Sequence, residues 1–157
     1  GAAGKFEWWA NLSWARIADS FDGTEVLRSW DQTHAFNAGF NWNTGKWVLS
    51  SAVIYRTGWP TSTVELDETA DFPTVSVPDR NDERLGAYGS LDIRLAREIE
   101  FERSALSVFV ELANITDRTN TCCLEYEIGD EEDEGLFVLD ERSYMPRIPS
   151  LGFLWKF

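Results

Sequence analysis

The chain has few of the side chains from which catalytic and metal sites are built. Its 157 residues include one histidine, two cysteines and one methionine. Zinc sites take about four ligands, and His34 is far in sequence from the adjacent pair Cys122 and Cys123. No serine has a plausible base nearby in the pattern, and no glycine-rich phosphate loop follows a predicted strand. We therefore expect no catalytic site, no confident metal site and no resident cofactor.

Long hydrophobic runs and basic residues are also scarce. No run of about eighteen apolar residues occurs, which excludes a transmembrane helix. The chain opens on Gly1-Ala2-Ala3-Gly4, without an initiator methionine or the charged and apolar regions of a signal peptide. We expect the chain to be a piece of a longer protein. With 14 Lys and Arg against 27 Asp and Glu, the net charge of -13 disfavours nucleic acid as a partner.

What the chain does have is alternation with a period of two residues. In residues 6–16 the even positions include Phe6, Trp8 and Trp14, whereas the odd positions include Glu7 and Asn11. Such alternation is typical of a strand with one apolar and one polar face. The pattern predicts antiparallel strands over residues 6–16, 30–42, 47–56, 90–96, 106–113 and 151–157, of which the third is the least regular.

The connections between these strands alternate in length. Residues 43–45 and 98–103 form short turns, whereas residues 19–27, 59–83 and 118–145 form long connections. The eight Trp, ten Phe and four Tyr are many for this length, and several lie near strand ends. Together these features predict an all-β segment of a transmembrane β-barrel. A soluble β-sandwich or barrel is the alternative.

Six short sequence motifs give a more specific prediction. They are residues 6–10 (FEWWA), 28–34 (RSWDQTH), 55–60 (YRTGWP), 91–94 (LDIR), 111–117 (ELANITD) and 146–152 (PRIPSLG). In order and spacing the chain resembles the C-terminal strands of TonB-dependent outer-membrane receptors. The resemblance implies that residues 1–157 are the last part of a barrel of about 22 strands. Barrels of this kind begin at about eight strands, so about six cannot close alone.

The resemblance also implies a function and partners. The family takes up siderophores, cobalamin, haem or saccharides with energy delivered by TonB through a plug domain. The plug and the earlier strands are not in this sequence. The remaining partners would be outer-membrane lipid, lipopolysaccharide and the barrel assembly machinery, with Phe153, Trp155 and Phe157 as the assembly signal. The location would be the outer membrane of a Gram-negative bacterium, with long loops outside and short turns in the periplasm. The alternative is a passive structural or adhesive outer-membrane barrel with acidic loops.

The polar faces of the predicted strands supply candidates for contact with solute or plug. In a large barrel the inward face carries the polar residues. The candidates are Glu7, Asn11, Asp31, Asn37, Arg56, Asp92, Arg94 and Glu111. The same residues would also serve as an internal lattice of hydrogen bonds and charges that holds the strands together, and the sequence leaves both roles open.

Acidic residues gather in the long connections. Residues 125–141 contain nine carboxylates and no Lys or Arg. Asp130, Glu132 and Glu134 are weak candidates for binding calcium, which prefers oxygen ligands. Their contiguous spacing does not match a calcium-binding loop, and a solvated loop is the alternative.

The two cysteines are adjacent, in the last long connection. An oxidising compartment favours a disulfide. Cys122 and Cys123 would form a strained eight-membered ring that locks a local turn, and pairing with a cysteine outside this sequence is the alternative.

Overall fold

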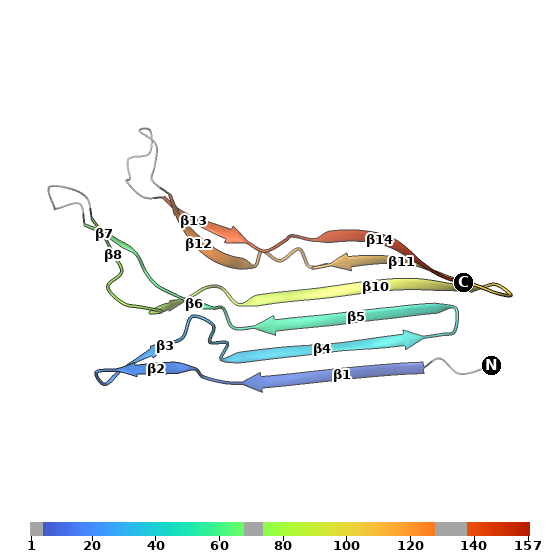
Figure 1. Cartoon of the computed structure of the whole chain (residues 1–157), viewed down its shortest axis with the longest axis horizontal. Helices are drawn as coiled ribbons and strands as arrows, with labels where there is room; N and C mark the ends of the chain where they lie inside the picture. The colour runs from blue at the N-terminus through green and yellow to red at the C-terminus, as the bar shows by residue number, and fades with distance from the viewer. Residues whose placement is uncertain (1–4, 68–73, 128–137) are drawn as a thin grey trace.

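The fold is a single antiparallel sheet with small hairpins at one end. The computed structural model describes residues 5–67, 74–127 and 138–157. Six long strands lie in chain order, each antiparallel to its neighbour (Figure 1). They are β1 (Lys5–Trp14), β4 (His34–Asn43), β5 (Trp47–Arg56), β10 (Tyr88–Glu100), β11 (Ala105–Ala113) and β14 (Ile148–Lys156). The all-β class and the six-stranded antiparallel sheet are confirmed. Within the described ranges, no helix is long and apolar enough to cross a membrane.

Short strands pair within the long connections. They form β2 (Ala18–Phe21) with β3 (Thr24–Leu27), β6 (Pro60–Thr61) with β9 (Glu83–Arg84), β7 (Glu65–Asp67) with β8 (Thr74–Ser76), and β12 (Thr121–Glu127) with β13 (Val138–Ser143). All lie beyond the same end of the long strands, whereas the short turns, the start of β1 and the end of β14 lie at the other end (Figure 1). The predicted separation of long and short connections therefore holds in three dimensions.

The short turns are made by local hydrogen bonds. Between β4 and β5, the side chain of Asn43 accepts a hydrogen bond from the amide of Gly45 at 2.7 Å. Gly45 has a φ of 91°, which glycine adopts without steric cost. Between β10 and β11, the amide of Phe101 donates to the carbonyl oxygen of Ser104 at 2.8 Å. The strand limits differ most from the sequence prediction at β4, which begins at His34 rather than at residue 30, and at β10, which spans Tyr88–Glu100 rather than residues 90–96.

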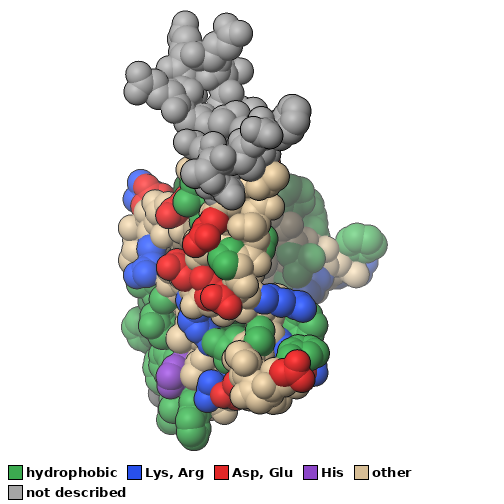
Figure 2. All heavy atoms as spheres, turned by 90° about the vertical axis from the view of Figure 1, so that its left-hand side faces the viewer, with side chains coloured by type: hydrophobic (Ala, Val, Ile, Leu, Met, Phe, Trp, Pro, Cys, Tyr) green, Lys and Arg blue, Asp and Glu red, His purple; other side chains and the backbone are tan. Residues whose placement is uncertain are grey.

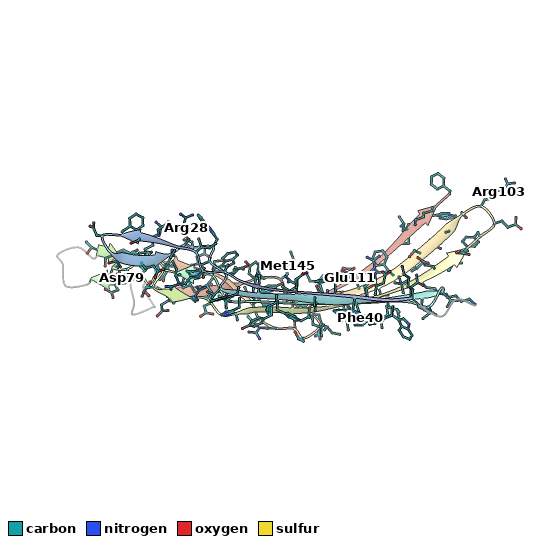
Figure 3. All side chains as sticks on the ribbon, turned by 90° about the horizontal axis from the view of Figure 1, so that it is seen from below. Arg28, Phe40, Asp79, Arg103, Glu111 and Met145 are labelled. Carbon is teal, nitrogen blue, oxygen red and sulfur yellow. The ribbon has the colours of Figure 1, made fainter. Side chains whose placement is uncertain are left out.

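The register separates the residues of the long strands into two faces. On one face, rows of directly opposed residues are apolar, as in the row Phe6, Trp42, Leu49, Leu95, Val110 and Leu151. Another row contains Ala10, Ala38, Val53 and Leu91. We call this the apolar face. The opposite, polar face carries Glu7, Asn41, Arg94 and Glu111, and in the edge-on view Phe40 and Glu111 lie on opposite sides of the sheet (Figure 3).

The sheet has almost no apolar core. Apart from Pro60, Ala96 is the only buried apolar residue among those the structure describes. Trp8 and Phe153 on the apolar face are each 72% exposed. The side chains stay exposed because the sheet is a single layer, as the edge-on view shows, and no second layer packs against either face (Figure 3).

Candidate functional site

A row of polar side chains crosses the whole sheet on its polar face. The register places Glu7 opposite Asn41, Asn41 opposite Ser50, Ser50 opposite Arg94, Arg94 opposite Glu111, and Glu111 opposite Ser150. Every one of the six long strands contributes one member to this polar row. Directly opposed side chains lie close enough to interact, so the row joins strands that are far apart in sequence.

Contacts along the polar row are both ionic and aromatic. Arg94 Nη1 lies 3.7 Å from Glu111 Oε2, and its guanidinium lies 3.8 Å from the ring centre of Phe109. At the other end, Lys5 Nζ lies 2.5 Å from Glu7 Oε1. In the middle, the hydroxyl of Ser50 hydrogen-bonds to the side-chain oxygen of Asn41. Since these charged side chains are each about 40% or more exposed, they can also contact a molecule lying on the sheet.

A hollow of about 460 Å³ lies along the polar row. Four of the predicted contact residues are in its lining, namely Glu7, Asp92, Arg94 and Glu111. Trp9 supplies an aromatic wall, and Gly39 opposite makes room for it. A Cβ at Gly39 would lie 2.9 Å from Trp9 Cζ2, so any larger residue there would displace the indole. The hollow thus combines carboxylates, a guanidinium and an exposed aromatic surface.

Two other predicted residues, Asn11 and Asn37, lie elsewhere on the same face. They are directly opposed on β1 and β4, four residue pairs along the register from the Glu7–Asn41 pair. Arg56 lies at the hairpin end, where its guanidinium is 4.4 Å from the ring centre of Tyr88, 5.6 Å from that of Trp59 and 5.8 Å from that of Tyr144. Aromatic rings attract a guanidinium at such distances. Arg56 therefore joins the end of β5 to the start of β10 and to the second and third long connections.

Asp31, the remaining candidate, lies off the sheet before β4 and is fully buried. Its carboxylate accepts hydrogen bonds from the Ile17 amide at 2.6 Å and the Thr33 hydroxyl at 2.9 Å, and it forms an ion pair with Arg84. Burial raises the pKa of the Asp31 carboxyl, but the hydrogen bonds from Arg84, Ile17 and Thr33 together outweigh burial and hold the pKa below its ordinary value. The contacts join three segments, so the geometry gives Asp31 a structural role.

Three buried asparagines, Asn81, Asn114 and Asn120, were not among the sequence candidates. Asn120 is 2% exposed, and its side chain accepts from the Gly89 amide at 2.8 Å and donates to the Gly89 carbonyl oxygen at 2.9 Å. Asn114 is 5% exposed with a φ of 48°, and its amide donates to Asp92 Oδ1 at 2.8 Å. Asparagine tolerates this left-handed conformation better than most residues. The alternation of apolar and polar residues did not predict the turn that begins at Asn114, within the motif Asn114-Ile115-Thr116-Asp117.

The hairpin end carries mixed charge. Seen from that end, acidic and basic side chains lie interspersed (Figure 2). Arg28 binds Asp19 Oδ1 at 2.6 Å, and Asp82 accepts hydrogen bonds from the Thr63 amide and hydroxyl at 2.9 and 2.8 Å. The calcium candidates Asp130, Glu132 and Glu134 lie outside the described residues. In the described part of the chain, no group of three or more His, Cys, Asp or Glu side chains is arranged to hold a metal ion.

The other sequence candidates lie at two separate places. Phe153 and Trp155 are on the apolar face of β14, opposite Val108 and Leu106, and Phe157 follows the strand, fully exposed. Cys122 and Cys123 are free thiols on β12, with their sulfur atoms 2.7 Å apart.

The arrangement as a whole provides a polar binding surface on one side of the sheet and an apolar surface on the other. Comparison with protein-family models, with curated proteins and with solved structures gives no match. The inference about function therefore rests on the geometry and on the sequence pattern.

Proposed function

We propose that this chain is part of the wall of an outer-membrane β-barrel. The observation that carries the proposal is the single-layered sheet, in which a largely apolar face, with Ser51 and Arg97 as polar members, backs a polar face with almost no buried core between them. Monomeric soluble proteins rarely expose apolar patches larger than a few hundred Å². Hydrocarbon on one side and an aqueous lumen on the other would solvate both faces without a second layer.

The distribution of aromatic residues supports lipid rather than a second protein layer. On the apolar face, the aliphatic row of Ala10, Ala38, Val53 and Leu91 lies between rows with large rings. Phe6 and Trp42 are opposed toward the turn end, and Phe36 and Tyr55 toward the hairpin end. Membrane barrels concentrate aromatic residues at both interfaces. A packed interface between two sheets has no reason to order its residues in this way.

A pair of adjacent substitutions tests the membrane orientation. Ala10 and Asn11 are both exposed and lie next to each other in the middle of β1, on opposite faces. In the longer barrel that contains this chain, reconstituted in lipid vesicles, we expect Ala10→Arg to lower the free energy of unfolding by about 2–4 kcal/mol, the cost of Arg on the lipid face at the bilayer midplane. Asn11→Arg, the matched control, should cost less than about 1 kcal/mol because it faces water. The measurement is urea unfolding in vesicles followed by tryptophan fluorescence. Equal losses for the two variants would contradict the proposal.

Within that class, we propose a TonB-dependent receptor for a siderophore, cobalamin, haem or a saccharide. The polar row and its hollow support this choice, because they offer charges and an aromatic ring to a solute or plug on the lumen side. The proposed role is transport rather than catalysis. The proposed partners are the rest of the barrel, the plug, TonB, lipopolysaccharide and the assembly machinery.

The receptor and the passive barrel make different predictions for the longer protein that contains this chain. Uptake by a receptor requires the proton-motive force, so an uncoupler should abolish it while leaving surface binding of the solute intact. A passive or adhesive barrel would show the same solute flux with and without the uncoupler. Measuring uptake of labelled solutes from each of the four classes, in cells with and without TonB, separates the two functions.

A further inference from the structure

The β12–β13 hairpin contains a bulge at its adjacent cysteines. The ladder passes from the pair Thr121 and Ser143 to the pair Cys123 and Arg142, and it skips Cys122. In a regular strand, neighbouring side chains point to opposite faces. The extra residue of a bulge breaks that alternation, and here the two sulfur atoms come to 2.7 Å.

The thiols are accessible and have each other as the nearest reaction partner. Cys123 is exposed and Cys122 is half-buried, and the sequence has no other cysteine. Hydrogen bonding to Cys122 raises the pKa of the Cys123 thiol above its ordinary value. Cys123 therefore holds its proton more firmly than a lone exposed thiol does.

We propose that Cys122 and Cys123 are a reversible redox pair that interconverts between two thiols and a vicinal disulfide. A small-molecule disulfide would act as the oxidant. One cysteine, as its thiolate, attacks a sulfur of that oxidant and releases the first thiol, and the second cysteine then displaces the other half as a second thiol. The cysteines lose two electrons and two protons, and the oxidant gains both. The pairing depends on the bulge and not on the membrane proposal.

Reversibility follows from the spacing of the two residues. Consecutive Cα atoms are about 3.8 Å apart across a trans peptide bond, whereas most disulfides join Cα atoms about 4.4–6.8 Å apart. A ring between adjacent residues is therefore strained, and strained, exposed disulfides are more easily reduced than structural ones. This distinguishes the pair from a permanent cross-link.

Ring closure would fix the geometry of the hairpin. The bulge is flanked by Thr121, whose hydroxyl lies 3.3 Å from Glu141 Oε2, and by Arg142, which contacts Glu125 at 2.6 Å and Asp140 at 3.2 Å. A disulfide would hold the bulge in place and with it the register of these pairs. Oxidation would thus stabilise one arrangement of charge at the hairpin end.

The test is a redox titration of the full chain, folded in detergent and checked by the near-ultraviolet circular dichroism of its tryptophans. Samples are equilibrated in mixtures of reduced and oxidised glutathione, quenched in acid and alkylated, and the free thiols are counted by intact mass. We expect both thiols to disappear together, without a glutathione adduct or a covalent dimer. The equilibrium constant for closure should be about tenfold larger in the folded than in the urea-unfolded chain, or about 30 mV.

Two variants serve as controls. Cys122→Ser and Cys123→Ser should each form only a mixed disulfide with glutathione, since the ring requires both sulfurs. Accumulation of glutathione adducts or dimers in the unsubstituted chain would overturn the proposal, and so would equal closure constants in the folded and unfolded chains. Neither result would affect the vesicle experiment with Ala10→Arg, so the two proposals fail separately.

Discussion

A carboxylate removed from water must be hydrogen-bonded or paired to be tolerated. Asp31 meets that condition with donors from three segments, the residues after β1, the residue before β4, and β9. Arg84 adds hydrogen bonds to the carbonyl oxygens of Asp31 at 3.1 Å and Gly58 at 3.0 Å. At the scale of single residues, this ion pair is the main polar anchor of the hairpin end.

Removing one partner of that pair should be costly. We expect Arg84→Met to lower the free energy of unfolding by about 3–5 kcal/mol, because it leaves the Asp31 carboxylate buried without its counter-charge. Arg28→Met is the matched control, since it removes an exposed pair with Asp19, and exposed ion pairs contribute little to stability. Urea titration of both variants, monitored by tryptophan fluorescence, gives the comparison. Similar losses would show that the Asp31 site is not an anchor.

The same carboxyl group predicts a pH dependence. Because the pKa of Asp31 is lower in the folded chain than its ordinary value, its contribution to stability is fully present above about pH 4. The contribution is lost as the pH falls through the lower, folded pKa. The stability difference between the unsubstituted chain and Asp31→Asn should therefore be constant between about pH 5 and 7 and shrink in acid. If the stability difference between the two proteins instead grew in acid, the pKa of Asp31 would not be lowered in the folded chain.

At the scale of elements, the connection after β5 depends on close backbone contact. A Cβ at Gly58 would lie 1.8 Å from the carbonyl oxygen of Leu85, next to the β6–β9 pair, whereas a Cβ at Gly86 would meet nothing within 4 Å. The contact atom belongs to the backbone of Leu85, so it cannot move away as the end of a flexible side chain could. Gly58 therefore allows the two ends of the second long connection, between β5 and β10, to pack closely against each other.

Substitution of these two glycines should have unequal effects. We expect Gly58→Ala to destabilise the chain by about 1–3 kcal/mol through overpacking, with faster hydrogen exchange at the amides of Thr61, Glu83 and Arg84. Gly86→Ala, two residues from the same pair of strands, should change the free energy of unfolding by less than about 1 kcal/mol. Hydrogen exchange measured by mass spectrometry resolves both regions. Equal exchange in the two variants would contradict the contact.

The sequence predicted the long strands well and the hairpin end poorly. Alternation extends over ten residues in β1, so the strand and its two faces follow from local pattern. The assignment of Asp31 to a strand used the same alternation, but the amide of Asp31 donates to the carbonyl oxygen of Arg28 at 2.9 Å and turns the chain there. Its partner Arg84 is 53 residues away. No local pattern can specify such a contact, nor the one between Asn120 and Gly89, 31 residues apart.

At the scale of the whole molecule, the sheet has two open edges, formed by its first and last strands. β1 and β14 are first and last in the strand order, so each has one neighbour within the sheet. The outer backbone groups of such strands readily pair with another chain, and hydrocarbon leaves them no water to bond. The wall proposed above would be complete only when both edges are joined to further strands.

The isolated chain should therefore associate. We expect the 17.9 kDa chain to sediment in detergent as dimers or larger species at micromolar concentration, through β1, β14 or both. Analytical ultracentrifugation with detergent density matching measures the protein mass directly. A monomer at all concentrations would show that these edges are satisfied in some other way.

The count of long strands has a consequence for how such chains can change. An even number of antiparallel strands returns the chain to the end from which it set out, and the described part begins and finishes at the short-turn end (Figure 1). A segment of this kind can be inserted into a larger meander, duplicated or deleted without reversing the direction of any other strand. Genes encoding such walls can therefore lengthen or shorten by whole hairpins while every remaining loop stays on its own side.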